Sequence, residues 1–93
     1  MTNEYPIMEI VWIDSCDEVS ATLSFVPRLR PYITRTVGYL VHEDSECISL
    51  AAEIETVDPS ETRDIEPRCK HVVTIPLVQI KERHCLRDSL GQT

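Results

Sequence analysis

The chain has 93 residues and a formal net charge of −7 at pH 7, with 16 acidic and nine basic side chains. A chain of this length forms one small domain that buries only about 60–65% of its unfolded surface. The acidic balance argues against a general phosphate-backbone binder, because such binding is driven by cationic neutralisation and counterion release. We therefore expect one domain over residues 1–93, with a core between about 7 and 84 and a flexible tail over 86–93.

The compartment is predicted from the amino terminus and the cysteines. The start, MTNEYPIMEI, lacks the basic region and long apolar core of a secretory signal. No run approaches the roughly 20 apolar residues that cross a bilayer. We expect a cytoplasmic protein without a membrane partner, in the host cytoplasm if the protein is viral. The four cysteines are then expected as reduced thiols.

The first predicted strand is Ile7–Ile13, with Met8, Ile10 and Trp12 alternating on one face. Residues 14–31 then lose the alternation, carry a few apolar side chains and end between two prolines. This segment is too long for an ordinary hairpin loop. We expect a short helix that begins near Asp17, or a lid whose apolar side chains cover one end of the core.

The best predicted hairpin joins a strand over Tyr32–His42 to a strand over Cys47–Ile54, with the polar turn HEDSE between the two apolar runs. The first strand of this hairpin has an apolar face formed by Ile33, Val37, Tyr39 and Val41. The second has an apolar face formed by Ile48, Leu50, Ala52 and Ile54. Gly38 predicts a bend, a bulge or a close approach of another backbone.

Two further strands are predicted after an acidic, turn-rich segment. The fourth runs from Cys69 to Ile75, and Pro76 interrupts it because proline has no amide hydrogen to donate. A short fifth strand is predicted over Leu77–Arg83, where Val78 and Ile80 alternate with polar residues.

These five strands resemble the Sm-like and SH3-like small barrels. The resemblance rests on G-x-L-x-x-x-D at Gly38, Leu40 and Asp44, followed by the apolar Ile48 and Leu50. It also rests on VVTIPLVQI, which occupies the place of the second Sm motif. It implies a mainly β fold: a five-stranded, strongly bent antiparallel barrel with a long loop or short helix after the first strand.

The resemblance does not carry over the RNA pocket of the Sm family. That pocket commonly uses an arginine and a glycine where this chain has Pro76 and Leu77, and an asparagine where it has Ser49. The whole chain also resembles small bacteriophage accessory proteins, in which a W-x-D-S start, a V-G-Y-L-V-x-E centre and a T-I-P ending recur. This second resemblance implies a viral accessory protein and supplies no established chemistry; phage accessory proteins commonly act by stoichiometric occupancy of a target.

A ligand site, if built from side chains, would draw on arginines and aromatic rings. Arginine offers a planar fork suited to phosphate, and aromatic rings stack bases. The predicted ligand-binding residues are Arg28, Arg30, Arg35, Trp12, Tyr39 and His42. The alternative for each is ordinary packing, or pairing with one of the many acidic side chains.

Metal and catalytic sites have weaker candidates. Cys69, His71, His84 and Cys85 are zinc-ligand types, but their spacing matches no standard zinc motif. The other reading is two buried thiols and two solvated histidines. A nucleophile would pair Cys16 or Ser15 with His42, His71 or His84 as its base, but nothing in the sequence brings such a pair together, and no G-x-S-x-G elbow is present. We therefore expect no enzyme and no cofactor.

The predicted function is a non-enzymatic binding protein of the phage accessory type. Such a protein would self-associate into a homo-oligomer and either sequester a small anionic ligand, such as a signalling nucleotide, or block a host protein. Acidic residues over 53–66 would suit a basic protein partner. The alternatives are an Sm-like RNA-binding regulator and a small zinc-binding protein.

Overall fold

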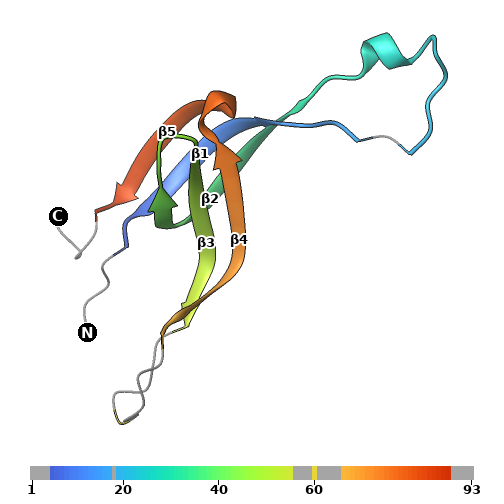
Figure 1. Ribbon diagram of the computed structural model, residues 1–93. Coiled ribbons are helices and arrows are strands. Elements are labelled where there is room, and N and C mark those ends of the chain that lie inside the picture. Colours follow the sequence, from blue (N-terminus) through green and yellow to red (C-terminus); the bar gives the residue numbers. More distant parts are fainter. Residues whose placement is uncertain (1–4, 18, 56–59, 61–65, 89–93) are drawn as a thin grey trace.

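A computed structural model describes residues 5–17, 19–55, 60 and 66–88. One antiparallel sheet holds five strands in the order β4-β3-β2-β1-β5 (Figure 1). Its elements are β1 (Ile7–Asp14), η1 (Val26–Arg28), β2 (Tyr32–Glu43), β3 (Cys47–Glu55), β4 (Arg68–Pro76), η2 (Leu77–Gln79) and β5 (Ile80–Arg87). Within these ranges η1 and η2 are single 3-10 turns and no α-helix occurs. The predicted short helix near Asp17 is therefore wrong for the residues described there.

β1 forms the centre of the core, as its alternation predicts. Met8, Ile10 and Trp12 are all buried on one face, and they pack with Ile48, Leu50 and Ile75 from β3 and β4. Burying a side chain of this size contributes about 1.5–3 kcal/mol to the stability of the fold. The six residues therefore hold three strands of the sheet together.

The predicted β2–β3 hairpin is confirmed, and Gly38 marks a close approach of two backbones. A Cβ added at Gly38 would lie 2.8 Å from the carbonyl oxygen of Ala51 and 3.1 Å from the Cβ of Leu50. Real Cβ atoms essentially never come that close to a backbone oxygen. Only glycine fits at this point without moving β2 away from β3.

The burial of β3 departs in part from the predicted alternation. Ile48 and Leu50 are buried as expected, but Ala52 is exposed. Ala51, on the other face, is fully buried beside Gly38. Ser49 is also buried, and its hydroxyl shares a 2.8 Å hydrogen bond with Thr74 on β4.

β2 turns its more apolar face to solvent. Ile33 and Val37 are 58% and 52% exposed, whereas Leu40 packs against the core. The reason is the pairing with β1, which sets Thr36 opposite Ile10 and Gly38 opposite Met8. Residues paired across strands share a face, so the larger side chains of β1 decide which face of β2 turns inward.

The predicted fifth strand is wrong at its start. Leu77–Gln79 form the turn η2, and β5 begins at Ile80. Pro76 ends β4, and the amide of Leu77 donates instead to the carbonyl of Glu46 in the β2–β3 turn at 2.9 Å. β5 also reaches Arg87, past the predicted end of the core; the tail residues 89–93 lie outside the described residues, as does most of the acidic segment 53–66.

The sheet is neither closed nor strongly curled into a barrel, which corrects the predicted Sm/SH3-like barrel. β4 and β5 lie at opposite ends of the strand order, where β4 pairs with β3 and β5 pairs with β1. The strand count, the antiparallel pairing and the mainly β class are confirmed. Closure into a barrel would require the edge strands β4 and β5 to pair with each other, and the strand order holds no such pair.

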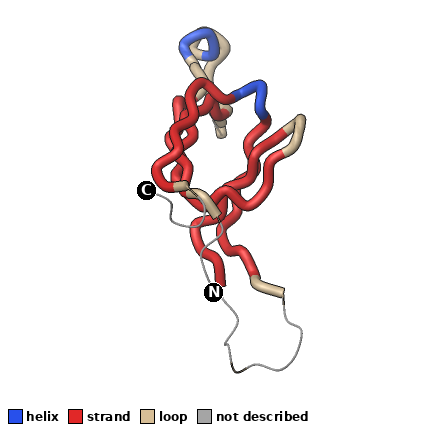
Figure 2. The backbone as a smooth tube through the Cα atoms, turned by 90° about the vertical axis from the view of Figure 1, so that its left-hand side faces the viewer, coloured by secondary structure: helices blue, strands red, loops and turns tan. Residues whose placement is uncertain are grey.

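A projecting loop connects β1 to β2, and we call its described residues, 15–17 and 19–31, the arm. It extends beyond the end of the sheet in both views (Figures 1 and 2). Leu23 is 90% exposed, and Phe25 and Val26 are each 46% exposed. The predicted lid over the core is therefore wrong, because these apolar side chains project away from it.

Candidate functional site

The six predicted ligand-binding residues lie in separate regions of the described structure. Trp12 belongs to the core, where its indole Nε1 donates to the hydroxyl of Thr36 at 2.9 Å. Because its ring is buried and its donor is satisfied, Trp12 is positioned to pack the sheet and not to stack a base from solvent. Its packing alternative is the one that this geometry favours.

Arg35 and Tyr39 lie on the opposite face of the sheet from Trp12. They belong to β2, where Arg35 is set opposite Val11 and Tyr39 opposite Ile7. A guanidinium nitrogen of Arg35 lies 3.6 Å from a carboxylate oxygen of Glu9 on β1. Arg35 is exposed and Glu9 is half-buried; their ion pair contributes little to folding, but it places a cation and an anion side by side on the surface.

Arg28 and Arg30 lie in the arm, which projects beyond the end of the sheet that carries the other four (Figure 1). Arg28 ends the turn η1. Arg30 donates through Nη1 to the carbonyls of Pro27 and Leu29, at 2.7 and 2.8 Å. Part of its hydrogen-bonding fork is therefore occupied by its own loop, whereas the arm still presents two cationic groups to solvent.

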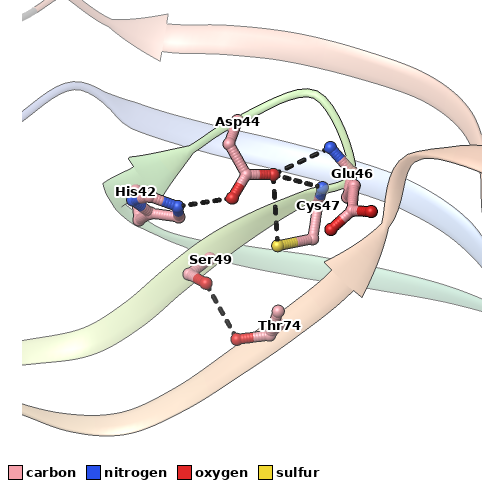
Figure 3. Close-up of polar contacts among 6 residues, drawn as sticks. All are labelled: His42, Asp44, Glu46, Cys47, Ser49 and Thr74. Atoms are coloured by element: carbon pink, nitrogen blue, oxygen red, sulfur yellow. Dashed lines mark hydrogen bonds and ion pairs between the residues drawn. The ribbon is translucent and has the colours of Figure 1, made fainter.

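His42 belongs to a polar cluster at the β2–β3 turn (Figure 3). Its Nε2 lies 2.8 Å from Oδ2 of Asp44. Oδ1 of Asp44 accepts from the amides of Glu46 and Cys47, at 2.8 and 2.9 Å, and from the thiol of Cys47 at 3.6 Å. Asp44 thus closes the turn with both of its oxygens, a common role for aspartate at the start of a tight turn.

The charges in this cluster argue against a nucleophilic cysteine. The hydrogen bond from His42, followed by those from the two amides, holds the pKa of Asp44 well below its usual range. Desolvation, followed by the negative charge of Asp44, raises the pKa of the Cys47 thiol. Because the thiolate is the reactive form, a thiol held protonated at neutral pH is a poor nucleophile.

An ion pair that sequence reasoning missed joins Glu43 to Arg83. Arg83 on β5 donates from both terminal nitrogens to the two carboxylate oxygens of Glu43, at 2.8 and 3.2 Å. The hydrogen bond from Arg83 lowers the pKa of Glu43, and the same bond raises that of Arg83. The two residues are 40 positions apart and lie on strands that are not neighbours. No local signal in the sequence points to such a pair.

The four predicted zinc ligands are divided between the two edges of the sheet. Cys69 and His71 belong to β4, and His84 and Cys85 belong to β5. Among the described residues, no three of the side chains His, Cys, Asp and Glu come together as a metal site would require. His84 instead lies 3.0 Å from Glu82, and the thiol of Cys85 donates to Asp88 at 3.1 Å. The described chain therefore does not bring the four predicted ligands together.

The arm and the β1–β2 surface beside it are candidate functional surfaces that lie outside most of the predicted ligand-binding residues. Large apolar side chains are exposed there within the described chain: Ile13, Val19, Leu23, Phe25, Val26, Ile33 and Val37. Val19, Leu23, Phe25 and Val26 belong to the arm, and Ile13, Ile33 and Val37 to the sheet; exposed apolar side chains that gather beside charges mark interaction sites. In the sequence, the alternation of β2 is the sign of the β1–β2 surface, but the pairing with β1 is needed to tell which side of β2 faces outward.

No protein-family model, curated protein or solved structure matches this chain. Within the part of the chain that the structure describes, no helix is long and apolar enough to span a membrane.

Proposed function

We propose that this is a non-enzymatic binding protein that self-associates and acts by occupying a partner protein. The observation that carries the proposal is the projecting arm, whose exposed side chains include Leu23, Phe25 and Val26. Exposing such side chains to water is unfavourable, by about 25 cal/mol per Å² of apolar surface, and a partner that covers them recovers this free energy. The resemblance to phage accessory proteins points to a host protein as the partner.

The charge of the arm suits a protein partner as well. Arg28 and Arg30 border its apolar side chains. An apolar centre with a charged rim is the usual composition of a protein–protein interface. Arginine and aromatic side chains are also the residue types that most often dominate binding energy in such interfaces.

The test is retention of a host protein by the immobilised full-length chain. Leu23→Glu and Phe25→Glu each place a charge on the apolar surface of the arm, and Val78→Glu is the matched control, because Val78 is 95% exposed on η2. We expect one protein to be retained at fixed stoichiometry by the wild type and by Val78→Glu, but not by the arm variants. Equal retention by all four chains, or by none of them, would contradict docking through the arm.

Capture of a small anion is a second candidate, supported by the two arginines of the arm. A melting-temperature screen with ATP, cyclic AMP and cyclic di-GMP tests it, because a ligand at 100 times its Kd stabilises the folded state by about 2.7 kcal/mol. The expected result is a rise with one of these nucleotides that Arg28→Ala abolishes. No rise with any of them would remove this candidate.

A further inference from the structure

One face of the β1–β2 pair, on the side opposite Met8, Ile10 and Trp12, carries exposed apolar side chains, although Val11 within it is buried. We call it the outer face. It comprises, from β1, Ile7, Glu9, Val11 and Ile13, and from β2, Ile33, Arg35, Val37 and Tyr39. The opposite face of the same strands carries Met8, Ile10 and Trp12. Ile13, Ile33 and Val37 of the outer face are exposed.

The order of side chains along the outer face makes it complementary to itself. Starting from the arm, the paired positions are Ile13 with Ile33, Val11 with Arg35, Glu9 with Val37, and Ile7 with Tyr39. Charges therefore occupy the two middle levels, and apolar or aromatic side chains occupy both ends. When two copies stack with this order reversed, the cationic level of one faces the anionic level of the other. The apolar ends then cover each other.

The size and shape of a single chain leave room for such a contact. The chain exposes 7250 Å², whereas a compact monomer of its mass is expected to expose about 5,500 Å². The projecting arm accounts for part of this excess (Figure 1), and each partner of a stable interface contributes roughly 800 Å² of surface.

We infer that the outer face is the interface of a two-fold symmetric dimer, in which Arg35 of each copy lies beside Glu9 of the other. A two-fold interface uses the same surface on both copies, so a surface on which a cation and an anion lie side by side suits it. This inference rests on the self-association part of the proposed function. The inference names the outer face as the surface through which two copies associate. The arm tip then stays free for a different partner.

The first experiment measures the dimer dissociation constant of full-length variants by sedimentation velocity. Ile33→Thr and Val37→Thr remove apolar contact while keeping a β-branched side chain, so the strand is retained. We expect the double variant to raise the dissociation constant at least tenfold. Val78→Thr, which alters an exposed valine on η2, is the matched control and should leave it unchanged.

The second experiment uses charge reversal and does not depend on the stability of one variant. Arg35→Glu leaves two acids on the outer face, and Glu9→Arg leaves two bases. Each variant alone should dimerise at least tenfold more weakly than the wild type, whereas an equal mixture of the two should form a heterodimer, detected by native mass spectrometry. Arg68→Glu, on the edge strand β4, is the control and should dimerise normally.

The outcomes separate this inference from the proposed function. A wild-type dimer that is unaffected by both the threonine and the charge variants would overturn the inference and leave self-association standing. Weak homodimers of both charge variants that form no heterodimer in the mixture would overturn the pairing of Arg35 with Glu9. A wild type that stays monomeric would overturn both, and a loss of host-protein retention confined to the arm variants bears only on docking.

Discussion

Replacing Gly38 with alanine should destabilise the fold, although the same change often stabilises proteins. A new Cβ at this position would lie 2.8 Å from the carbonyl oxygen of Ala51 and 3.3 Å from its carbonyl carbon. These are backbone atoms, so no flexible side chain can yield. Because Tyr39 pairs with Ala51 at this point, relief requires β2 and β3 to move apart within their hydrogen-bonded ladder.

The size of the effect follows from two opposing contributions. Overpacking of this kind costs about 1–3 kcal/mol. Alanine also restricts the unfolded chain, which stabilises the folded state by about 0.4–1 kcal/mol. The net loss should be about 1–2 kcal/mol, which lowers the melting temperature of a domain of this size by about 5–15 °C.

The assay is thermal unfolding followed by circular dichroism, at one fixed protein concentration because self-association makes the melting temperature depend on it. Thr34→Ala is the control: Thr34 lies on the same strand and face but is half-buried. It should shift stability by less than about 1 kcal/mol. A melting temperature of Gly38→Ala equal to or above that of the wild type would refute the reasoning from the backbone contact.

Three further predictions concern the core, the turn and a strained residue. Ile48→Ala should cost about 2–5 kcal/mol in urea denaturation, because Ile48 is fully buried, whereas Val78→Ala should stay within about 0.5 kcal/mol; equal effects would contradict the assigned core. The pKa of Asp44 is lowered in the folded state, so its contribution to stability is present above about pH 4 and is lost as the pH falls further. Asp44→Asn should therefore flatten the fall of the urea midpoint between about pH 5 and pH 2, and parallel curves for the two proteins would show that the turn is not held by this carboxylate. His71 has a φ of 55°, a left-handed conformation that costs about 1–2 kcal/mol, more than the roughly 0.5–1 kcal/mol lost by placing glycine in a strand. His71→Gly should then raise the unfolding free energy by about 0.5–1 kcal/mol while Val72→Gly lowers it, and a loss in both would contradict the strain.

Strand alternation predicted most of the sheet because Met8, Ile10 and Trp12 of β1, and Ile48 and Leu50 of β3, follow the strand period and are buried. Met8, Ile10 and Trp12 repeat every second residue and are buried together. The turn at Asp44 was predictable as well, since a polar run between two apolar runs indicates a hairpin. Gly38 was correctly expected to mark a bend, a bulge or a close approach.

The errors arose where pairing between distant segments overrides local pattern. β2 alone suggests that Ile33 and Val37 face the core. The pairing with β1 instead places Ile10 and Trp12 on the core side of the sheet, and Ile33 and Val37 lie on the opposite side. The predicted start of β5 was wrong because the amide of Leu77 donates to the β2–β3 turn, so the chain forms the turn η2 at Leu77 and does not yet pair as a strand. Sheet closure likewise depends on strand pairing that no local window contains.

The candidate site was the least predictable part. The six proposed ligand-binding residues were chosen by chemical type, and type does not determine the face of the sheet on which each one lies. Arg35 and Trp12 are on opposite faces of the same strand pair, so one pocket in a single chain does not gather both. The exposed apolar surface would have been visible only if the β1–β2 register had been known.

The most direct test of the account is the mass of the wild-type protein in solution. Sedimentation equilibrium from about 1 μM to about 1 mM covers dissociation constants across the range typical of transient and stable dimers. A dimer through the outer face should give a species of twice the 10.7 kDa chain mass at the upper concentrations, with dissociation on dilution. A constant mass of 10.7 kDa over the whole range would contradict it.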